Sequence, residues 1–283
     1  MKKFLVFFLV LTLTVWFATA EEMERDEIGL TISLEFGIDE VNTSDKYPYS
    51  WLSVRYETEL LDGALDIGAE IAHDMGFVDG LPQGLYFDLM AGINIDVGES
   101  STLSIILENE NYVDLDADGD KVAGVFKPGL MFNQSFDGGD IYFKLDSPIA
   151  YLFYGIDPFF GLDITAGWES AFGLGIEVSG HILFNNLYDD EKGFTGVGFT
   201  TFFDAEPIYA EVAVTIPIKD LSDGSPYYYF DVAAMDIGIC ITPLFSFAIS
   251  PLFQIYASCQ FGGIGVDGGD ISITPAIGII LSF

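Results

Sequence analysis

Basic residues are scarce in this chain of 283 residues: Lys and Arg together number 10, against 44 Asp and Glu, and the formal net charge is −34. Binding to nucleic acid through its phosphates needs clustered Lys and Arg, so the composition excludes that class of partner. Cysteine is scarce too, because Cys240 and Cys259 are the only two. Two cysteines permit one disulfide but do not amount to a disulfide framework.

Long apolar runs and helical periodicity are also missing. After residue 20 no stretch is apolar for long enough to cross a bilayer as a helix, which excludes a helical inner-membrane protein. Disorder is excluded as well, because half of the residues are hydrophobic and the mean hydropathy is +0.39. An apolar chain that carries 44 acids must separate the two kinds of residue with a regular period.

The first 20 residues have the pattern of a secretory signal peptide. Lys2 and Lys3 precede an apolar run over 4–17, and Ala18-Thr19-Ala20 forms a small-x-small cleavage site. The apolar run is shorter than the roughly 18–20 residues of a spanning helix, which speaks against a membrane anchor. We therefore expect cleavage after Ala20, a short periplasmic tail over 21–27 and one structural domain over 28–283. So short a tail leaves no room for a plug or passenger domain.

Almost everywhere in the rest of the chain, apolar residues occur at every second position. This alternation predicts strands with one apolar and one polar face. A clear example is 85–97, where Leu, Phe, Ala, Ile and Val alternate with Asp, Asn, Gly, Tyr and Met. Fourteen such runs are found, at 28–37, 50–60, 64–73, 85–97, 102–112, 122–136, 141–154, 160–168, 174–184, 194–203, 208–216, 227–241, 245–261 and 270–283.

The connections between the runs alternate between long polar segments and tight turns such as Leu61-Asp62-Gly63, where Gly, Asn and Asp supply positive φ. This is the layout of an outer-membrane barrel, with long loops outside and short turns in the periplasm. The sequence thus predicts an all-β fold: a closed antiparallel transmembrane up-and-down β-barrel of about 14 strands, with 12 or 16 as alternatives.

The last strand resembles the C-terminal signal of bacterial outer-membrane β-barrels, the porin-like superfamily. Ile271, Ile273, Pro275, Ile277, Ile279, Leu281 and Phe283 share one parity, and the chain ends on the aromatic Phe283. The resemblance implies insertion into the bacterial outer membrane by the barrel-assembly machinery, with Ile279, Leu281 and Phe283 as the assembly signal. It identifies no particular family. The alternative is a secreted β-sandwich whose last strand is amphipathic.

The charged residues show which face of each strand points inward. A side chain that faces the bilayer midplane lowers the stability of a barrel by about 2–4 kcal/mol if it is Lys or Arg, and by less if it is Asp or Glu. Parity then predicts which acids point inward: Glu35, Glu57, Glu59, Asp66, Glu70, Asp88, Asp96, Glu108, Glu110, Asp146, Asp163, Glu177, Glu211, Asp231 and Asp236. The inward basic residues are only Arg55, Lys127 and Lys144. Gly68, Gly92 and other small inward residues leave room for water.

These features favour a channel for passive diffusion of small hydrophilic solutes, with a preference for cations. The alternative is a non-conducting surface barrel, an adhesin or structural protein, that presents acidic loops. A channel for hydrophobic solutes would need a plug or a lateral opening, and the sequence suggests neither. The oligomeric state cannot be read from the pattern.

Two further patterns concern chemistry. Asp114, Asp116, Asp118 and Asp120 have the spacing of the start of a calcium loop, but position twelve is Val125 instead of Glu. Weak surface calcium binding and a merely solvated loop both remain open, and no other cofactor is expected. His73-Asp74 lacks an accompanying nucleophile, and neighbours on a strand point to opposite faces, so we expect no enzyme.

Aromatic residues near the ends of the runs suggest membrane-interface girdles, with ordinary strand packing as the alternative. They include Tyr47, Tyr49 and Trp51, Tyr151, Phe153 and Tyr154, Phe159 and Phe160, Trp168 and Phe172, and 227–230. For the cysteines, a turn at 242–244 would set Cys240 and Cys259 tens of ångströms apart, at about 3.3 Å per residue. We expect no disulfide between them, unless the turn lies at Ser250-Pro251.

Overall fold

The structure is a computed structural model that describes residues 28–39, 47–61, 63–76, 84–114, 122–152, 160–184, 193–220, 239–265 and 271–283. The predicted signal peptide with Ala18 and Ala20, the calcium pattern after Asp114, and Asp231 and Asp236 lie outside these residues. No described residue belongs to a helix that is long and apolar enough to cross a membrane.

Fifteen strand segments make up the described fold. They are β1 (Ile28–Asp39), β2 (Tyr47–Leu60), β3 (Leu65–Gly76), β4 (Gly84–Gly98), β5 (Ser101–Asp114), β6 (Val122–Phe136), β7 (Gly139–Asp146), β8 (Ile149–Leu152), β9 (Phe160–Ser170), β10 (Leu174–Phe184), β11 (Gly193–Ala205), β12 (Ile208–Asp220), β13 (Ile239–Ser250), β14 (Phe253–Ile264) and β15 (Ser272–Ser282).

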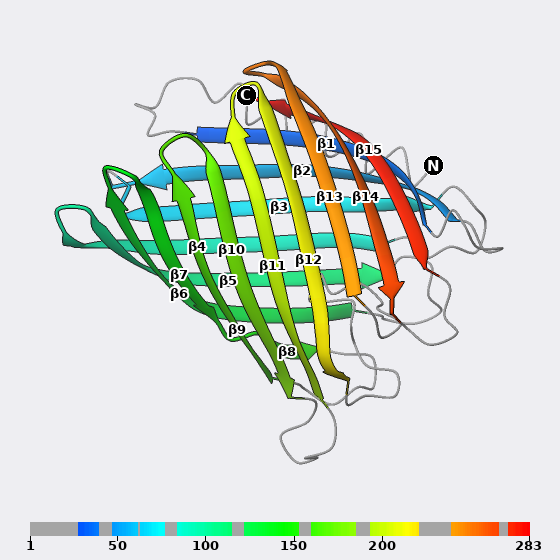
Figure 1. Cartoon of the computed structure of the whole chain (residues 1–283), viewed down its shortest axis with the longest axis horizontal. Coiled ribbons are helices and arrows are strands. Elements are labelled where there is room, and N and C mark those ends of the chain that lie inside the picture. The colour runs from blue at the N-terminus through cyan, green and yellow to red at the C-terminus, as the bar shows by residue number, and fades with distance from the viewer. Residues whose placement is uncertain are drawn as a thin grey trace.

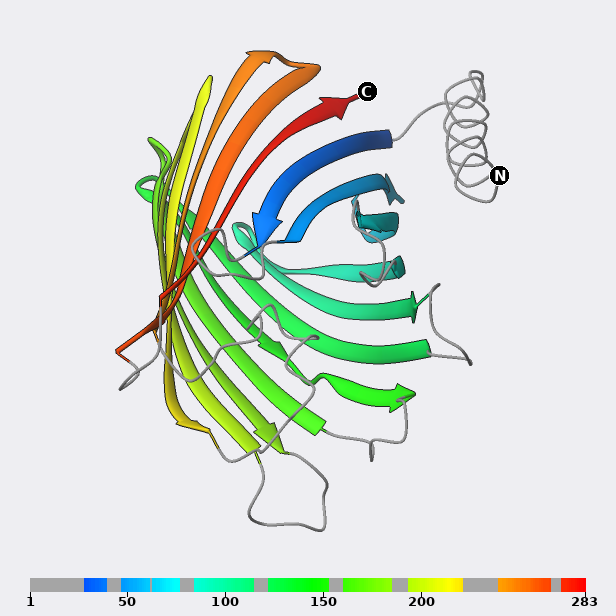
Figure 2. The same cartoon turned by 90° about the vertical axis from the view of Figure 1, so that its right-hand side faces the viewer.

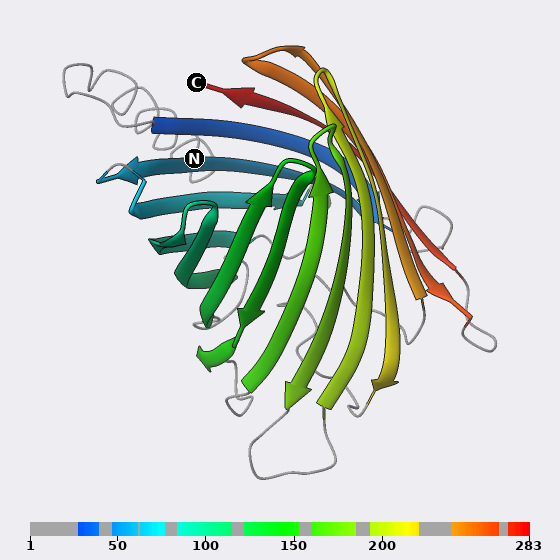
Figure 3. The same ribbon diagram turned by 60° about the vertical axis from the view of Figure 1, so that its left-hand side comes forward.

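Each strand runs antiparallel to its neighbours, and β1 pairs with β15 to close the sheet. Leu30 and Phe283 exchange backbone hydrogen bonds of 3.2 and 2.9 Å at this seam. In Figure 1, β1–β5 cross β10–β13 at a wide angle, as opposite walls of a barrel with tilted strands do. Figures 2 and 3 show the curved wall that encloses the interior.

One barrel strand is interrupted. β7 and β8 both lie between β6 and β9, and Ser147 and Pro148 separate them. Pro148 has no N–H to give to a ladder, and the break is held by backbone bonds from Ser147 to Pro128 (2.9 Å) and from Gly161 to Pro148 (2.8 Å). The fifteen segments thus form fourteen strands, which confirms the predicted closed antiparallel barrel and its strand number.

The hairpin of β13 and β14 corrects one predicted turn. The sequence suggested strands over 227–241 and 245–261 with a turn at 242–244, but β13 continues to Ser250 and the turn is formed by Pro251 and Leu252. The Ser250 hydroxyl accepts a hydrogen bond from the Leu252 N–H at 3.3 Å, and Pro251 has the fixed φ that such a turn needs. Of the segment 227–241, only residues 239–241 are described.

The two cysteines are free, although the turn lies beside Ser250-Pro251, the case in which the sequence left a disulfide open. The corrected turn brings their strands together, and Gln260 donates a hydrogen bond to the Cys240 sulfur at 3.3 Å. Gln260 and Cys240 therefore share a face, so Cys259, the neighbour of Gln260, points to the opposite face. The barrel wall keeps the two thiols apart.

The turn between β9 and β10 requires a glycine. Gly173 has φ +88°, and a Cβ there would overlap the carbonyl oxygen of Asp204 on β11. We expect Gly173→Ala to lower the free energy of unfolding by about 2–3 kcal/mol. Gly180→Ala on β10 is the matched control, because a Cβ at Gly180 would meet nothing within 4 Å. Denaturant unfolding in lipid vesicles measures both, and equal effects would contradict the assigned turn.

Candidate pore lining

The barrel has an inner face, and cross-strand hydrogen bonds identify it. Tyr256 on β14 reaches over β15 to Glu35 on β1 (2.8 Å), and Tyr142 on β7 reaches over β9 to Glu177 on β10 (2.6 Å). Such a bridge over a strand is favoured on the concave side of a curved sheet, where side chains from strands two apart converge. The parity of these residues therefore marks the interior.

The opposite parity carries the large apolar side chains. Leu89, Val178, Phe245 and Ile277 are 57%, 52%, 51% and 62% exposed, which is the reverse of a soluble core. Only a few hydrophobic residues of the described chain are fully buried. The apolar surface is therefore a continuous outer belt.

The strand register places every pore-lining candidate on the inner face. The candidates are Glu35, Arg55, Glu57, Asp66, Glu70, Asp88, Asp96, Glu108, Lys144, Asp163, Glu177 and Glu211. Two rows run across the strands from β2 to β6. The first contains Arg55, Glu70, Asp88 and Glu110, and the second contains Glu57, Glu108 and Lys127.

These rows form an acidic wall, which we define as the inward carboxylates of β2–β5. Near its centre, oxygen atoms of Asp88, Glu108 and Glu110 lie within 4.8 Å of one another. One oxygen of Asp88, Oδ1, is buried and has no hydrogen-bond partner among the described residues. Three carboxylates so close together concentrate negative potential on one side of the interior.

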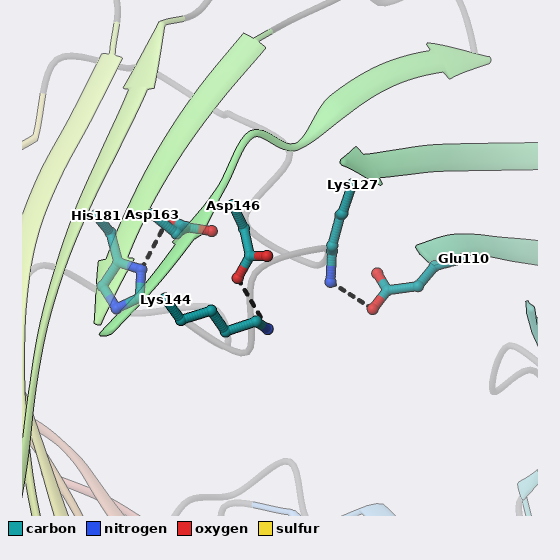
Figure 4. Close-up of polar contacts among 6 residues, drawn as sticks. All are labelled: Glu110, Lys127, Lys144, Asp146, Asp163 and His181. Carbon is teal, nitrogen blue, oxygen red and sulfur yellow. Dashed lines mark hydrogen bonds and ion pairs between the residues drawn. The ribbon is translucent and has the colours of Figure 1, made fainter. Parts of the chain in front are cut away.

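Among the described side chains, each basic one of this face is paired with an acid. Arg55 pairs with Glu57, Lys127 with Glu110, Lys144 with Asp146 (2.8 Å), and the His181 ring with Asp163 (2.9 Å). Figure 4 shows three of these pairs pointing into the enclosed space from neighbouring strands. The positive charges are thus already compensated, and most of the wall's carboxylates remain in excess.

His181 was not predicted as a partner of an acid. It lies four residues after Glu177 on β10 and therefore shares the inward parity of that acid, so the alternating pattern alone was enough to place it. Asp163 Oδ1 lies 2.9 Å from the Nδ1 atom of His181, and the Ser179 hydroxyl lies 3.2 Å from its Nε2 atom. Both ring nitrogens thus have partners on the inner face.

The other histidine lies on the outer face. His73 on β3 is the register partner of Leu52 on β2 and of Leu85 on β4, which both have the outward parity. The two histidines of the chain therefore lie on opposite faces of the barrel wall and do not belong to one site.

Tyrosine rings that pack over glycines of the neighbouring strand are the second feature of the inner face that the sequence did not reveal. Tyr256, Gly278 and Glu35 lie in one row across β14, β15 and β1, and the ring occupies the space over the glycine. Tyr142, Gly167 and Glu177 repeat this arrangement across β7, β9 and β10. Each phenol hydroxyl donates to the carboxylate beyond the glycine.

This arrangement corrects part of the girdle hypothesis. Tyr49 donates a hydrogen bond to Glu35 at 3.0 Å, and Trp51 is the register partner of Glu35, so both face inward and belong to no girdle. Phe160 and Trp168 have the outward parity, and their place in a girdle stays a prediction. The side chains of Tyr47, Tyr151, Phe153, Tyr154, Phe159 and residues 227–230 lie outside the described part.

Glu35 joins three strands at the seam, because Tyr49 and Tyr256 each donate to one of its oxygens. We expect Tyr256→Phe to lower the free energy of unfolding by about 1.5–3 kcal/mol, as for other hydrogen bonds to charged groups. In a Glu35→Gln background the same substitution should lower the free energy of unfolding by less, because the charged acceptor is gone. Equal costs in the two backgrounds, measured by denaturant unfolding, would rule out this coupling.

Comparison with known proteins supports the fold alone. No protein-family model matches the sequence, and no curated protein matches it. CdiB from Acinetobacter baumannii is a solved structure with 8% identity and a TM-score of 0.54, over 90% of this chain and 60% of that one. OprB from Pseudomonas putida has 10% identity and a TM-score of 0.50, over 91% and 94% of the two chains. The chain therefore shares the closed antiparallel barrel fold of these two proteins.

Proposed function

We propose that this chain is a porin-like channel of the bacterial outer membrane, through which small hydrophilic solutes diffuse passively and cations pass more readily than anions. The observation that carries this proposal is the acidic wall, because the described basic residues of the inner face, Arg55, Lys127 and Lys144, are already paired with acids. A cation in the interior meets uncompensated carboxylates, whereas an anion meets the same charges as a barrier.

Two features support the membrane location. The outer belt of exposed apolar side chains suits hydrocarbon, and the closed ladder leaves no unpaired sheet edge along β1 and β15. Outer-membrane lipid and the barrel-assembly machinery are the proposed partners, the latter through Ile279, Leu281 and Phe283. Phe283 is 62% exposed and thus accessible to such a partner.

Room for water is the third requirement of the proposal. Across from the acidic wall, the inward positions of β11 and β12 hold small neutral residues such as Gly198, Thr200, Ala213 and Thr215. A barrel of fourteen strands lies between the filled eight-stranded barrels and the open channels of 16–18 strands. Small side chains on one wall widen the interior at this strand number.

Solute flux into proteoliposomes tests the channel. Vesicles that contain the refolded chain should swell in small neutral sugars and in salts of small cations, and more slowly as the solute becomes larger. Vesicles without protein and vesicles with heat-unfolded chain are the controls. A folded barrel that admits no solute would contradict the proposal and favour a non-conducting surface barrel.

A further inference from the structure

A hollow of about 900 Å³ lies in the inner wall, formed by β1–β6. Its lining comes from residues near the short turns, such as Glu59 at the end of β2 and Asp66 at the start of β3. Gly68 and Gly92 help to make the space, because a Cβ at either position would lie against Met90 or Asp66. The proposed channel function does not by itself require such a hollow.

One side of the hollow is acidic and held in place. Glu59 and Asp66 are direct register partners on β2 and β3, so their side chains are neighbours. Asn94 donates to Asp66 Oδ2 at 2.7 Å and to the Gly63 carbonyl at 2.9 Å. Ser104 in turn donates to Asn94 Oδ1 at 2.6 Å. This network orients Asp66 toward a fixed position.

Neither carboxylate has a basic partner among the described side chains. The nearby guanidinium of Arg55 is bound to Glu57, and the other described basic groups of the interior pair with Glu110, Asp146 and Asp163. Two neighbouring carboxylates without a counter-charge attract a cation into the hollow.

The other side of the hollow is apolar. Met90, Ile106 and Met131 line it from β4, β5 and β6. Methionine side chains are flexible and polarizable, so they adapt to apolar groups of different shape. A bare Ca²⁺ or Mg²⁺ ion would gain nothing from these side chains, because both ions take oxygen ligands.

We propose that this hollow is a binding site for small organic ammonium ions that carry an apolar group. The ammonium lies between Glu59 and Asp66, and the apolar group lies against Met90, Ile106 and Met131. The inference deepens the proposed function and rests on it, since it names a class of solute that the interior admits.

Equilibrium binding of n-alkylammonium ions to the refolded chain tests this site. Calorimetric titration with methyl-, n-butyl- and n-hexylammonium should show an affinity that rises up to about fourfold for each added CH₂. Empty micelles serve as the blank for partitioning of the probes. Asp66→Asn should weaken n-butylammonium binding about tenfold, the usual effect of losing one charged hydrogen bond. Glu59→Gln should act in the same direction.

Two matched variants separate this site from the rest of the interior. Asp96→Asn neutralises an inward carboxylate that does not line the hollow and should leave binding unchanged. Met90→Ala with Met131→Ala should flatten the dependence on chain length and keep the binding of methylammonium. Affinity that is independent of chain length, or equal losses for Asp66→Asn and Asp96→Asn, would overturn the proposal. Flux without binding refutes this site alone, whereas binding without flux refutes only the channel.

Discussion

Neutralising the centre of the acidic wall should remove most of the proposed preference for cations. In the triple variant Glu70→Gln, Asp88→Asn and Glu108→Gln, three inward charges of β3, β4 and β5 are lost. At a distance of about 8 Å in water, each unit charge contributes about 0.5 kcal/mol to a passing cation. The sum of about 1.5 kcal/mol corresponds to about tenfold in cation occupancy, before screening by salt reduces it.

The reversal potential in a KCl gradient measures this effect. The charge-conserving variant Glu70→Asp, Asp88→Glu and Glu108→Asp is the matched control, and it should retain the preference. The neutral variant should also fold at least as well as the parent, because it relieves repulsion among carboxylates within 4.8 Å. Equal loss of selectivity in both variants would show that side-chain shape, and not charge, sets the preference.

Placing a lysine on the outer belt should destabilise the barrel far more than placing one next to it on the inner face. Phe199 lies at the middle of β11 and is 45% exposed on the outer parity, and its neighbour Thr200 faces inward beside Glu177. We expect Phe199→Lys to lower the free energy of unfolding by about 2–4 kcal/mol, the cost of a lysine at the bilayer midplane.

Thr200→Lys is the control, because its ammonium meets water and the carboxylate of Glu177. The expected change for this variant is within about 1 kcal/mol. Denaturant unfolding in phospholipid vesicles gives both values. If Thr200→Lys were the more damaging of the two, the assignment of inner and outer faces would be reversed.

Charge is the reason that the sequence predicted the faces of most strands correctly. Wherever an acid such as Asp88 or Glu177 occurs in an alternating run, it fixes the phase, because a carboxylate does not face hydrocarbon. Glycine and aspartate likewise marked the short turns. The strand number followed from these two signals.

The hairpin of β13 and β14 lacked both signals. No charged residue occurs between Asp236 and Asp267, and prolines at 243 and 251 offered two places for a turn. Apolar residues of both parities then fit either arrangement, so the turn was placed too early. Only the pairing of β13 with β12 and β14 decides between them.

Contacts across three strands could not be predicted for a different reason. The bond from Tyr256 to Glu35 joins residues at opposite ends of the chain and depends on the register of β15 against both neighbours. Alternation identifies the face of a residue but not its row. The hollow beside Met90 and Asp66 depends on rows in the same way.

The most direct test of the proposed carboxylate-lined pore is the planar-bilayer conductance of the refolded chain in a KCl gradient. Stepwise channels should appear, with a reversal potential of the sign that K⁺ permeation gives. A folded barrel without conductance, or a reversal potential that favours Cl⁻, would contradict the account.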